Sequence, residues 1–132
     1  RLSGKPGRVD DMHLPLGRAL AFWRRFDGAE EATFERAVQI LALPDLLDVP
    51  VRFLSTGQRK RAALARVMLA GAPVWLLDEP LNGLDAASAA AVEALVAKHC
   101  RDGGIALIAS HQPFALAGMA RLELAAFEPA EA

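Results

Sequence analysis

The segment that decides the fold class is Val74–Glu79, which reads VWLLDE. An apolar run over residues 73–77 is typical of a buried strand in a parallel sheet. Asp78 and Glu79 follow the run directly, so two carboxylates are expected at the carboxyl edge of that sheet, where ligands of such folds bind. The alternative is structural, since acids at the end of a strand also serve only to cap the next turn.

Further elements are predicted on both sides of this strand. Helical spacing of apolar residues and short apolar runs indicate a helix over 57–70, a helix over 86–100, a strand over 105–110, a short helix over 113–119 and a last strand over 121–127. Strands that alternate with helices through short connections predict a parallel α/β fold.

Before position 54 the sequence pattern is different, because most apolar residues recur at helical spacing. The sequence predicts an entering loop over 1–15, helices over 16–26 and 30–43, a turn at Leu46 and Leu47, and an extended stretch over 48–53. The expected organisation is therefore a helical lobe with its preceding loop (1–72) and an α/β half (73–132).

Composition excludes several classes of protein. The chain has 132 residues, of which 53% are hydrophobic, so an intrinsically disordered chain is excluded. Cys100 is the only cysteine, which excludes an internal disulfide framework and fits a reducing compartment. Residues 1–72 hold 12 Lys+Arg against 8 Asp+Glu, and residues 73–132 hold 3 against 8. No basic run is interleaved with aromatic residues, so a nucleic-acid partner is not expected.

A second candidate site is Leu54–Gln58, which reads LSTGQ and directly precedes a predicted helix. Ser55 is a favourable N-cap, and Gly57 lets a ligand approach the backbone closely. The free N–H groups at the start of a helix attract anions such as phosphate. An ordinary capped helix is the alternative interpretation.

Two further residues stand at predicted ends of secondary structure. His111 follows the second strand of the α/β half, where an imidazole can hydrogen-bond a terminal phosphate; a lone histidine is more often structural. Asp85 precedes the helix predicted over 86–100, either as its N-cap or as a contact with another subunit.

In this order and spacing, the motifs resemble those of the ATP-binding cassette (ABC) family of transport ATPases. Leu54–Gln58 is similar to the LSGGQ signature, with Thr56 in place of the first glycine. Val74–Glu79 resembles the Walker B strand and Asn82–Asp85 the D-loop, while His111 occupies the place of the switch histidine. The resemblance covers about residues 54 to 113, and it implies the carboxyl-terminal half of a P-loop NTPase sheet.

The resemblance also implies a role for each candidate residue. Asp78 would hold Mg²⁺, Glu79 would act as the catalytic glutamate that polarises the attacking water, and His111 would contact the γ-phosphate. The signature residues and the D-loop acid would bind ATP held by a second ATPase subunit in a head-to-tail homodimer; these residues are Ser55, Thr56, Gly57, Gln58 and Asp85.

Three segments are similar to one subfamily, the haem-exporter ATP-binding subunits of cytochrome c maturation (CcmA type). They are Asp48–Ser55, Arg59–Arg66 and Ser110–Pro113. This similarity implies an ATPase subunit that serves membrane-spanning transporter subunits and lies peripherally on the cytoplasmic face of the inner membrane. An ABC ATPase for another small-molecule cargo, or a non-transport cassette ATPase acting on ribosomes or DNA, is the alternative.

The chain departs from the family pattern in one respect, because the P-loop motif G-x-x-x-x-G-K-[ST] is absent. Gly4 and Lys5 are followed by Pro6, which supplies neither a hydroxyl for Mg²⁺ nor an N–H for phosphate. Lys5 instead stands where the family carries the glutamine of its Q-loop. We therefore expect the back part of a longer ATPase that alone neither binds ATP tightly nor hydrolyses it, with an exposed edge on its acidic strand.

Overall fold

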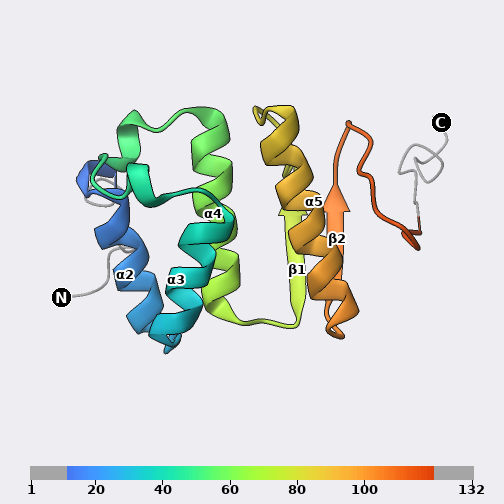
Figure 1. Ribbon diagram of the computed structural model, residues 1–132, viewed down its shortest axis with the longest axis horizontal. Helices are drawn as coiled ribbons and strands as arrows, with labels where there is room; N and C mark the ends of the chain where they lie inside the picture. The colour runs from blue at the N-terminus through green and yellow to red at the C-terminus, as the bar shows by residue number, and fades with distance from the viewer. Residues whose placement is uncertain (1–11, 121–132) are drawn as a thin grey trace, which may run out of the picture.

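The computed structural model describes residues 12–120 and contains a helical half beside an α/β half (Figure 1). The elements are α2 (Leu16–Asp27), α3 (Glu31–Ile40), η1 (Pro44–Leu46), η2 (Val51–Phe53), α4 (Thr56–Ala70), β1 (Val74–Asp78), α5 (Ala86–Arg101) and β2 (Ile105–Ala109). The two η segments are 3₁₀ helices that connect α3 to α4. Helix α4 packs against both α2 and α3, and α5 packs against β2.

Helix α2 begins and ends where its flanking residues dictate. Pro15 precedes it with φ −57°, a value that the pyrrolidine ring sets in advance. Gly28 ends it in the left-handed region at φ 70°, where its N–H donates to the carbonyl of Arg25. An ion pair of 2.9 Å between Arg24 and Glu31 then connects α2 to α3 across the turn.

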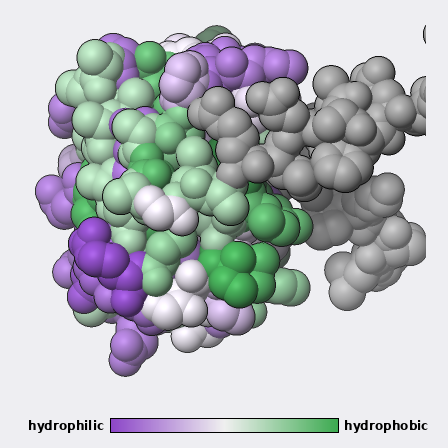
Figure 2. Space-filling model, turned by 90° about the vertical axis from the view of Figure 1, so that its right-hand side faces the viewer, coloured by the Kyte–Doolittle hydropathy of each residue, from purple (hydrophilic) through white to green (hydrophobic). Residues whose placement is uncertain are grey.

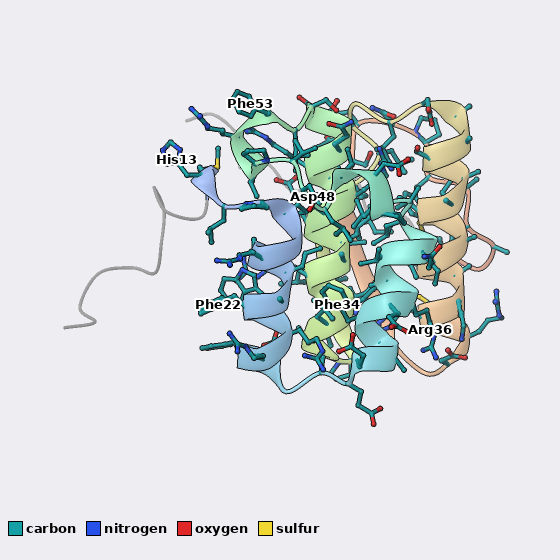
Figure 3. All side chains as sticks on the ribbon, turned by 60° about the vertical axis from the view of Figure 1, so that its left-hand side comes forward. His13, Phe22, Phe34, Arg36, Asp48 and Phe53 are labelled. Carbon is teal, nitrogen blue, oxygen red and sulfur yellow. The ribbon has the colours of Figure 1, made fainter. Side chains whose placement is uncertain are left out.

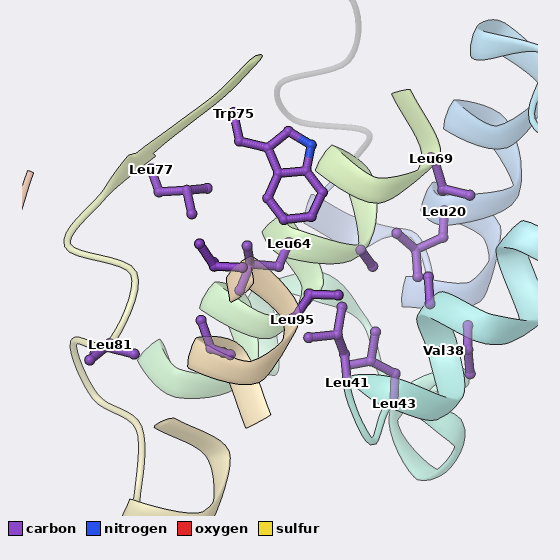
Figure 4. Packing of buried hydrophobic residues seen from close by; sticks show 14 of the residues in the cluster. Leu20, Val38, Leu41, Leu43, Leu64, Leu69, Trp75, Leu77, Leu81 and Leu95 are labelled. Carbon is purple, nitrogen blue, oxygen red and sulfur yellow. The ribbon is translucent and has the colours of Figure 1, made fainter. Parts of the chain in front are cut away.

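One hydrophobic core joins the two halves. Leu64 of α4 lies beside Trp75 and Leu77 of β1, and Leu69 of the same helix lies beside Leu20 of α2 (Figure 4). Leu95 of α5 belongs to the same cluster. All of these residues are buried, and burial of each side chain of this size contributes about 2 kcal/mol relative to exposure. The helical half and the α/β half are therefore packed together through α4.

The sheet described in residues 12–120 has two parallel strands, with Val74 beside Ile105 and Asp78 beside Ala109. Trp75 and Leu77 point to the buried face of the sheet. The opposite face is open, since Leu76 is 72% exposed and Leu107 is 60% exposed. Figure 2 shows a largely apolar surface, rimmed by polar residues, on the side of the molecule where β2 and the segment after it lie.

Two predicted elements are wrong. The stretch predicted as extended over 48–53 is a turn and a bend at residues 48 and 49 and a 3₁₀ helix over 51–53, in which Leu54 and Phe53 donate their N–H groups back to Val51 and Pro50. Residues 113–119 form no helix. The N–H of Ala115 donates 2.7 Å to the Glu93 carboxylate of α5, and Gly118 adopts φ 76°, which the α-helix does not contain.

The other predicted elements of the described range are confirmed within a few residues. The second helix is shorter than predicted and ends at Ile40, and Met12 and His13 have helical conformation within the predicted loop. The predicted strand 121–127 and most of the predicted loop 1–15 lie outside the described residues. No helix between residues 12 and 120 combines the length and the apolar character that crossing a membrane requires.

Candidate functional site

The candidate residues come from four elements that end or begin at one edge of the molecule. The starts of α4 and α5 and the ends of β1 and β2 all lie at the upper edge of Figure 1. Carboxyl ends of parallel strands and helix N-termini meet at this edge because each helix runs antiparallel to the strand it follows or precedes. At this edge the ends of β1 and β2 bring Glu79 and His111 into contact, 32 residues apart in the chain, and the start of α4 lies on the same side of the molecule (Figure 1).

The start of α4 is a complete capping box. Ser55 Oγ accepts a hydrogen bond of 3.2 Å from the Gln58 N–H, and the Ser55 N–H donates 2.8 Å to Gln58 Oε1. This confirms Ser55 as the N-cap and commits the Gln58 side chain to the helix start. The first N–H groups of a helix have no intrahelical partner, and of the residues that carry them here Thr56 is exposed whereas Gly57 is buried.

Gly57 is the point where α4 approaches the loop that follows β1. A Cβ atom added at Gly57 would collide with the Gly83 carbonyl oxygen, closer than any real Cβ contact. Gly83 in turn adopts φ 79°, a value that favours glycine. The two glycines thus let the helix start and the loop pack backbone against backbone, which is a structural need independent of any ligand.

Glu79 has the most constrained geometry at this edge. Its φ of 48° lies in the left-handed region, which non-glycine residues seldom adopt outside functional sites. Its N–H donates 2.7 Å to the Ala109 carbonyl at the end of β2. Its carboxylate accepts 2.9 Å from the His111 N–H, and its other oxygen lies 3.3 Å from the Ser110 hydroxyl. The single proton of that hydroxyl is shared with a second acceptor, the Gln112 carbonyl oxygen at 3.0 Å. The segment after β2 therefore holds this carboxylate on both oxygens.

His111 presents its backbone and its side chain in different directions. Its N–H binds Glu79, while its imidazole is 99% exposed and has Nε2 3.6 Å from Glu79 Oε1. The imidazole therefore stands at the surface beside the carboxylate, free to rotate toward a ligand placed on this edge.

Asp78 ends β1 with its side chain exposed at the same edge. Residues 12–120 contain no cluster of three or more histidine, cysteine or acidic side chains that could enclose a metal ion. Mg²⁺ takes oxygen ligands, and it commonly binds through one or two carboxylates and completes its shell with water and substrate phosphates. The exposed Asp78 carboxylate has the chemistry of such a ligand, and its role as one stays a prediction.

Asp85 is the N-cap of α5, and its Oδ1 accepts 2.7 Å from the Ser88 N–H. Hydrogen bonds from the backbone and the side chain of Ser88 lower the pKa of Asp85. The structural alternative for this residue is thus confirmed within the chain, and a contact with a second subunit stays a prediction.

Two residues at this edge were absent from the sequence prediction. Ser110 holds Glu79 and also accepts 3.0 Å from the Gln112 N–H, so it organises the turn after β2. Lys60 of α4 donates 3.0 Å from Nζ to the Asp78 carbonyl oxygen. Ser110 could have been noticed because it precedes His111, whereas no sequence signal relates Lys60 to Asp78. Lys5 lies outside the described residues.

A comparison with known protein families shows to which family the chain belongs. The model of the ABC transporter domain matches residues 8–82, more than half of the chain. The chain belongs to the ABC transporter family. The matched range includes both Leu54–Gln58 at the start of α4 and Val74–Glu79 along β1.

Curated relatives carry a more specific name. The chain is 55% identical over 121 residues to the cytochrome c biogenesis ATP-binding export protein CcmA of Novosphingobium aromaticivorans, covering 90% of this chain and 60% of that protein. It is 54% identical over 107 residues to the CcmA protein of Sphingopyxis alaskensis, covering 81% of this chain and 54% of that protein. The resemblance to CcmA-type subunits is therefore confirmed. The chain spans about half to three fifths of the length of these relatives.

Solved structures show the same fold. An ATP-binding subunit of an ABC transporter superposes with a TM-score of 0.69 at 22% identity, covering 81% of this chain and 46% of that one. RNase-L Inhibitor superposes with a TM-score of 0.63 at 24% identity, covering 80% of this chain and 21% of the other. The predicted α/β class, a part of a P-loop NTPase fold, is confirmed.

Proposed function

We propose that this chain supplies the signature, Walker B, D-loop and switch segments of an ATP-hydrolysing ABC subunit, and that this subunit works in cytochrome c biogenesis as a haem exporter. The observation that carries the proposal is Glu79, a strained carboxylate held by Ser110 and His111 at the carboxyl edge of a parallel sheet. Strain of this kind persists where surrounding contacts impose it, and it concentrates at functional sites. The names of the curated relatives support the transport process.

Three candidate residues at this edge would each have a role in ATP hydrolysis. Asp78 would hold Mg²⁺, and the ion would neutralise charge on the phosphate oxygens. Glu79 would orient the attacking water and accept its proton, because an ionised carboxylate can act as the general base when it is held at a fixed position. His111 would rotate to donate a hydrogen bond to the γ-phosphate.

The start of α4 would serve a nucleotide bound on a second copy of the ATPase. The exposed Ser55 and Thr56 would offer their hydroxyl and N–H donors to a phosphate at the start of α4, where the helix dipole is positive. Gln58 acts indirectly, because its side chain closes the capping box that fixes these donors. Asp85 fixes the start of α5 beside them and would lie at the interface between the two copies.

We also propose that ATP binding needs more protein than this chain. Residues 1–72 would form the signature lobe and residues 73–132 the α/β half, and neither contains a P-loop sequence. The open face of the sheet, on which Val74, Leu76, Ile105 and Leu107 are exposed, offers an apolar surface against which a P-loop-bearing part would pack. By itself the chain is expected to neither bind ATP tightly nor hydrolyse it.

The membrane-spanning partner would dock on α2. Phe22 is 45% exposed and Phe26 is 72% exposed, and their rings stack at 6.3 Å along one side of the helix. Phe22 points away from α3 and α4 (Figure 3). Trp23 contacts both rings and is held by the Arg66 guanidinium, 3.3 Å from its ring centroid. Docking there would place the subunit at the cytoplasmic face of the membrane.

The ATPase proposal is tested in a hybrid ATPase, in which the part of the Novosphingobium relative that this chain does not span is joined to the chain. Hydrolysis of MgATP by the hybrid supports the proposal. Glu79→Gln is expected to abolish turnover while ATP binding persists and the closed dimer accumulates, because only the proton acceptor is lost. Glu35→Gln, an exposed change on α3, is the matched control. Equal loss of binding and turnover in Glu79→Gln would show a structural role for Glu79.

The docking proposal has its own measurement. Phe22→Glu with Phe26→Glu is expected to prevent co-purification of the hybrid with the transporter's membrane-spanning subunits without reducing hydrolysis. Ile40→Glu changes an exposed apolar residue on α3 and is expected to leave co-purification intact. Membrane association that survives the α2 changes but fails with Ile40→Glu would assign the docking surface to α3.

A further inference from the structure

The peptide unit between Asp78 and Glu79 is held at both of its polar ends. The Asp78 carbonyl oxygen accepts 3.0 Å from Lys60 Nζ, which belongs to α4, the helix that begins at the proposed signature. The Glu79 N–H donates 2.7 Å to the carbonyl of Ala109 at the end of β2. A helix on one side and a strand on the other therefore fix the plane of this peptide.

The orientation of this peptide decides where the Glu79 carboxylate lies. Glu79 adopts φ 48°, and φ is the rotation that relates this peptide plane to the Glu79 Cβ. In a more ordinary backbone conformation the Cβ would project elsewhere, and the contacts with Ser110 and His111 would be lost. The left-handed conformation therefore needs contacts that impose it, and the bond from Lys60 is one of them.

Lys60 is suited to this contact because its charge is not committed elsewhere in the described structure. Within residues 12–120 its ammonium group forms no ion pair. It binds the carbonyl of Asp78, so the Asp78 carboxylate stays open at the edge. The donor is a charged ammonium group, and a hydrogen bond with an ionised donor is stronger than one between neutral groups.

We propose that Lys60 is a positioning residue for Glu79: by holding the Asp78 carbonyl it keeps the catalytic carboxylate in its productive orientation and ties that orientation to the signature helix. The inference rests on the proposed ATPase function. Because Lys60 and the N-cap Ser55 belong to the same rigid helix, any shift of the helix start toward a phosphate reaches the Asp78–Glu79 peptide. Lys60 thereby connects two sites within one subunit. One is the signature, which contacts one nucleotide, and the other is the Glu79 carboxylate, which acts on the second nucleotide.

The test compares Lys60→Met, Lys60→Arg and Lys98→Met in the hybrid ATPase. Methionine keeps the apolar stem but donates no hydrogen bond, whereas arginine retains a cationic donor. Lys98→Met is the matched control, because Lys98 pairs with exposed Asp102 at the far end of α5. Lys60→Met is expected to lower kcat about tenfold with KM for MgATP changed less than about twofold, and Lys60→Arg to recover most of the loss.

A second readout is hydrogen exchange at the Glu79 amide, followed by NMR in the same proteins. Exchange is expected to be faster in Lys60→Met than in Lys98→Met, because the peptide is released on its carbonyl side. An unchanged kcat in Lys60→Met, a rise in KM without a fall in kcat, or a loss that arginine does not recover would each overturn the proposal. If the parent hybrid fails to hydrolyse ATP, the ATPase proposal fails separately, and unchanged exchange at Glu79 would still overturn the positioning by Lys60.

Discussion

The carboxylate of Glu79 accepts a hydrogen bond of 2.9 Å from the backbone N–H of His111, across a separation of 32 residues in the chain. This hydrogen bond comes from the main chain of His111, whereas its imidazole is 99% exposed and has Nε2 3.6 Å from the same carboxylate oxygen, beyond hydrogen-bond distance. The two groups of His111 therefore have separate tasks. Its backbone N–H positions the Glu79 carboxylate, and its imidazole is the group that would contact a ligand. This separation can be measured.

His111→Ala is expected to leave the Glu79 carboxylate in place and to remove the hydrogen bond to the γ-phosphate. In the hybrid ATPase, kcat should fall about a hundredfold or more, the size of effect seen when one transition-state donor is lost. The NMR shift of the Glu79 amide should match that of the parent. A large change of that shift would contradict the separation, because it would mean that the imidazole also holds the carboxylate.

Ser110→Ala should have the opposite profile. The hydroxyl binds a Glu79 oxygen and also organises the turn through Gln112, so its loss should disturb the Glu79 environment in NMR. The backbone donor from His111 persists, and kcat should therefore fall only about tenfold. Ser88→Ala, in the first turn of α5, makes the same chemical change away from Glu79 and serves as the control. Equal effects of Ser110→Ala and Ser88→Ala on the Glu79 shift would refute a direct role for Ser110.

Gly57→Ala should destabilise the chain even without nucleotide. The new Cβ would collide with the Gly83 carbonyl oxygen, so α4 and the loop after β1 must move apart. Overpacking of this kind costs about 1–3 kcal/mol in the free energy of unfolding. Chemical denaturation measures this loss of stability. Gly71→Ala is the comparison, because its new Cβ would meet no atom within 4 Å and the variant would report only the cost of a positive φ. A Gly57→Ala protein as stable as the parent would show that the close approach is not required.

Asp85→Ala should give a pH-dependent loss of stability. The pKa of Asp85 is lowered in the folded chain by the hydrogen bonds from Ser88, below an ordinary value of 3.8. Its contribution is therefore present above pH 3.8 and is lost as the pH falls through the lower pKa of the folded state. The difference in Tm between Asp85→Ala and the parent should be full at about pH 7 and shrink toward about pH 3. A difference that stays constant over this range would mean that the carboxylate charge has no part in the cap.

The open sheet face should make the isolated chain self-associate. Leu76 and Leu107 are exposed on neighbouring strands, and in the described sheet β1 pairs only with β2. Sedimentation of the chain should show dimers or larger assemblies, which Leu76→Glu disperses. Phe26→Glu removes an equally exposed apolar residue from α2 and should leave the assemblies unchanged. A chain that sediments as a monomer at all concentrations would contradict this prediction.

The sequence alone determined the elements whose cause is local. Apolar runs identified the strands Val74–Asp78 and Ile105–Ala109, and cap residues located the starts of α4 and α5. The family motifs likewise depend on residue order, so their recognition needed no coordinates. Local rules failed at residues 113–119, where a long-range bond from Ala115 to Glu93 replaces helical bonding.

Only the tertiary structure decided how the site is held together. The positive φ of Glu79, its capture by Ser110 and His111, and the bond from Lys60 to Asp78 depend on contacts between segments that are 18 to 32 residues apart. No periodicity or propensity encodes such contacts, because they arise from the packing of α4 and β2 against the end of β1. The sequence therefore identified the candidate residues, and the fold determined their orientation.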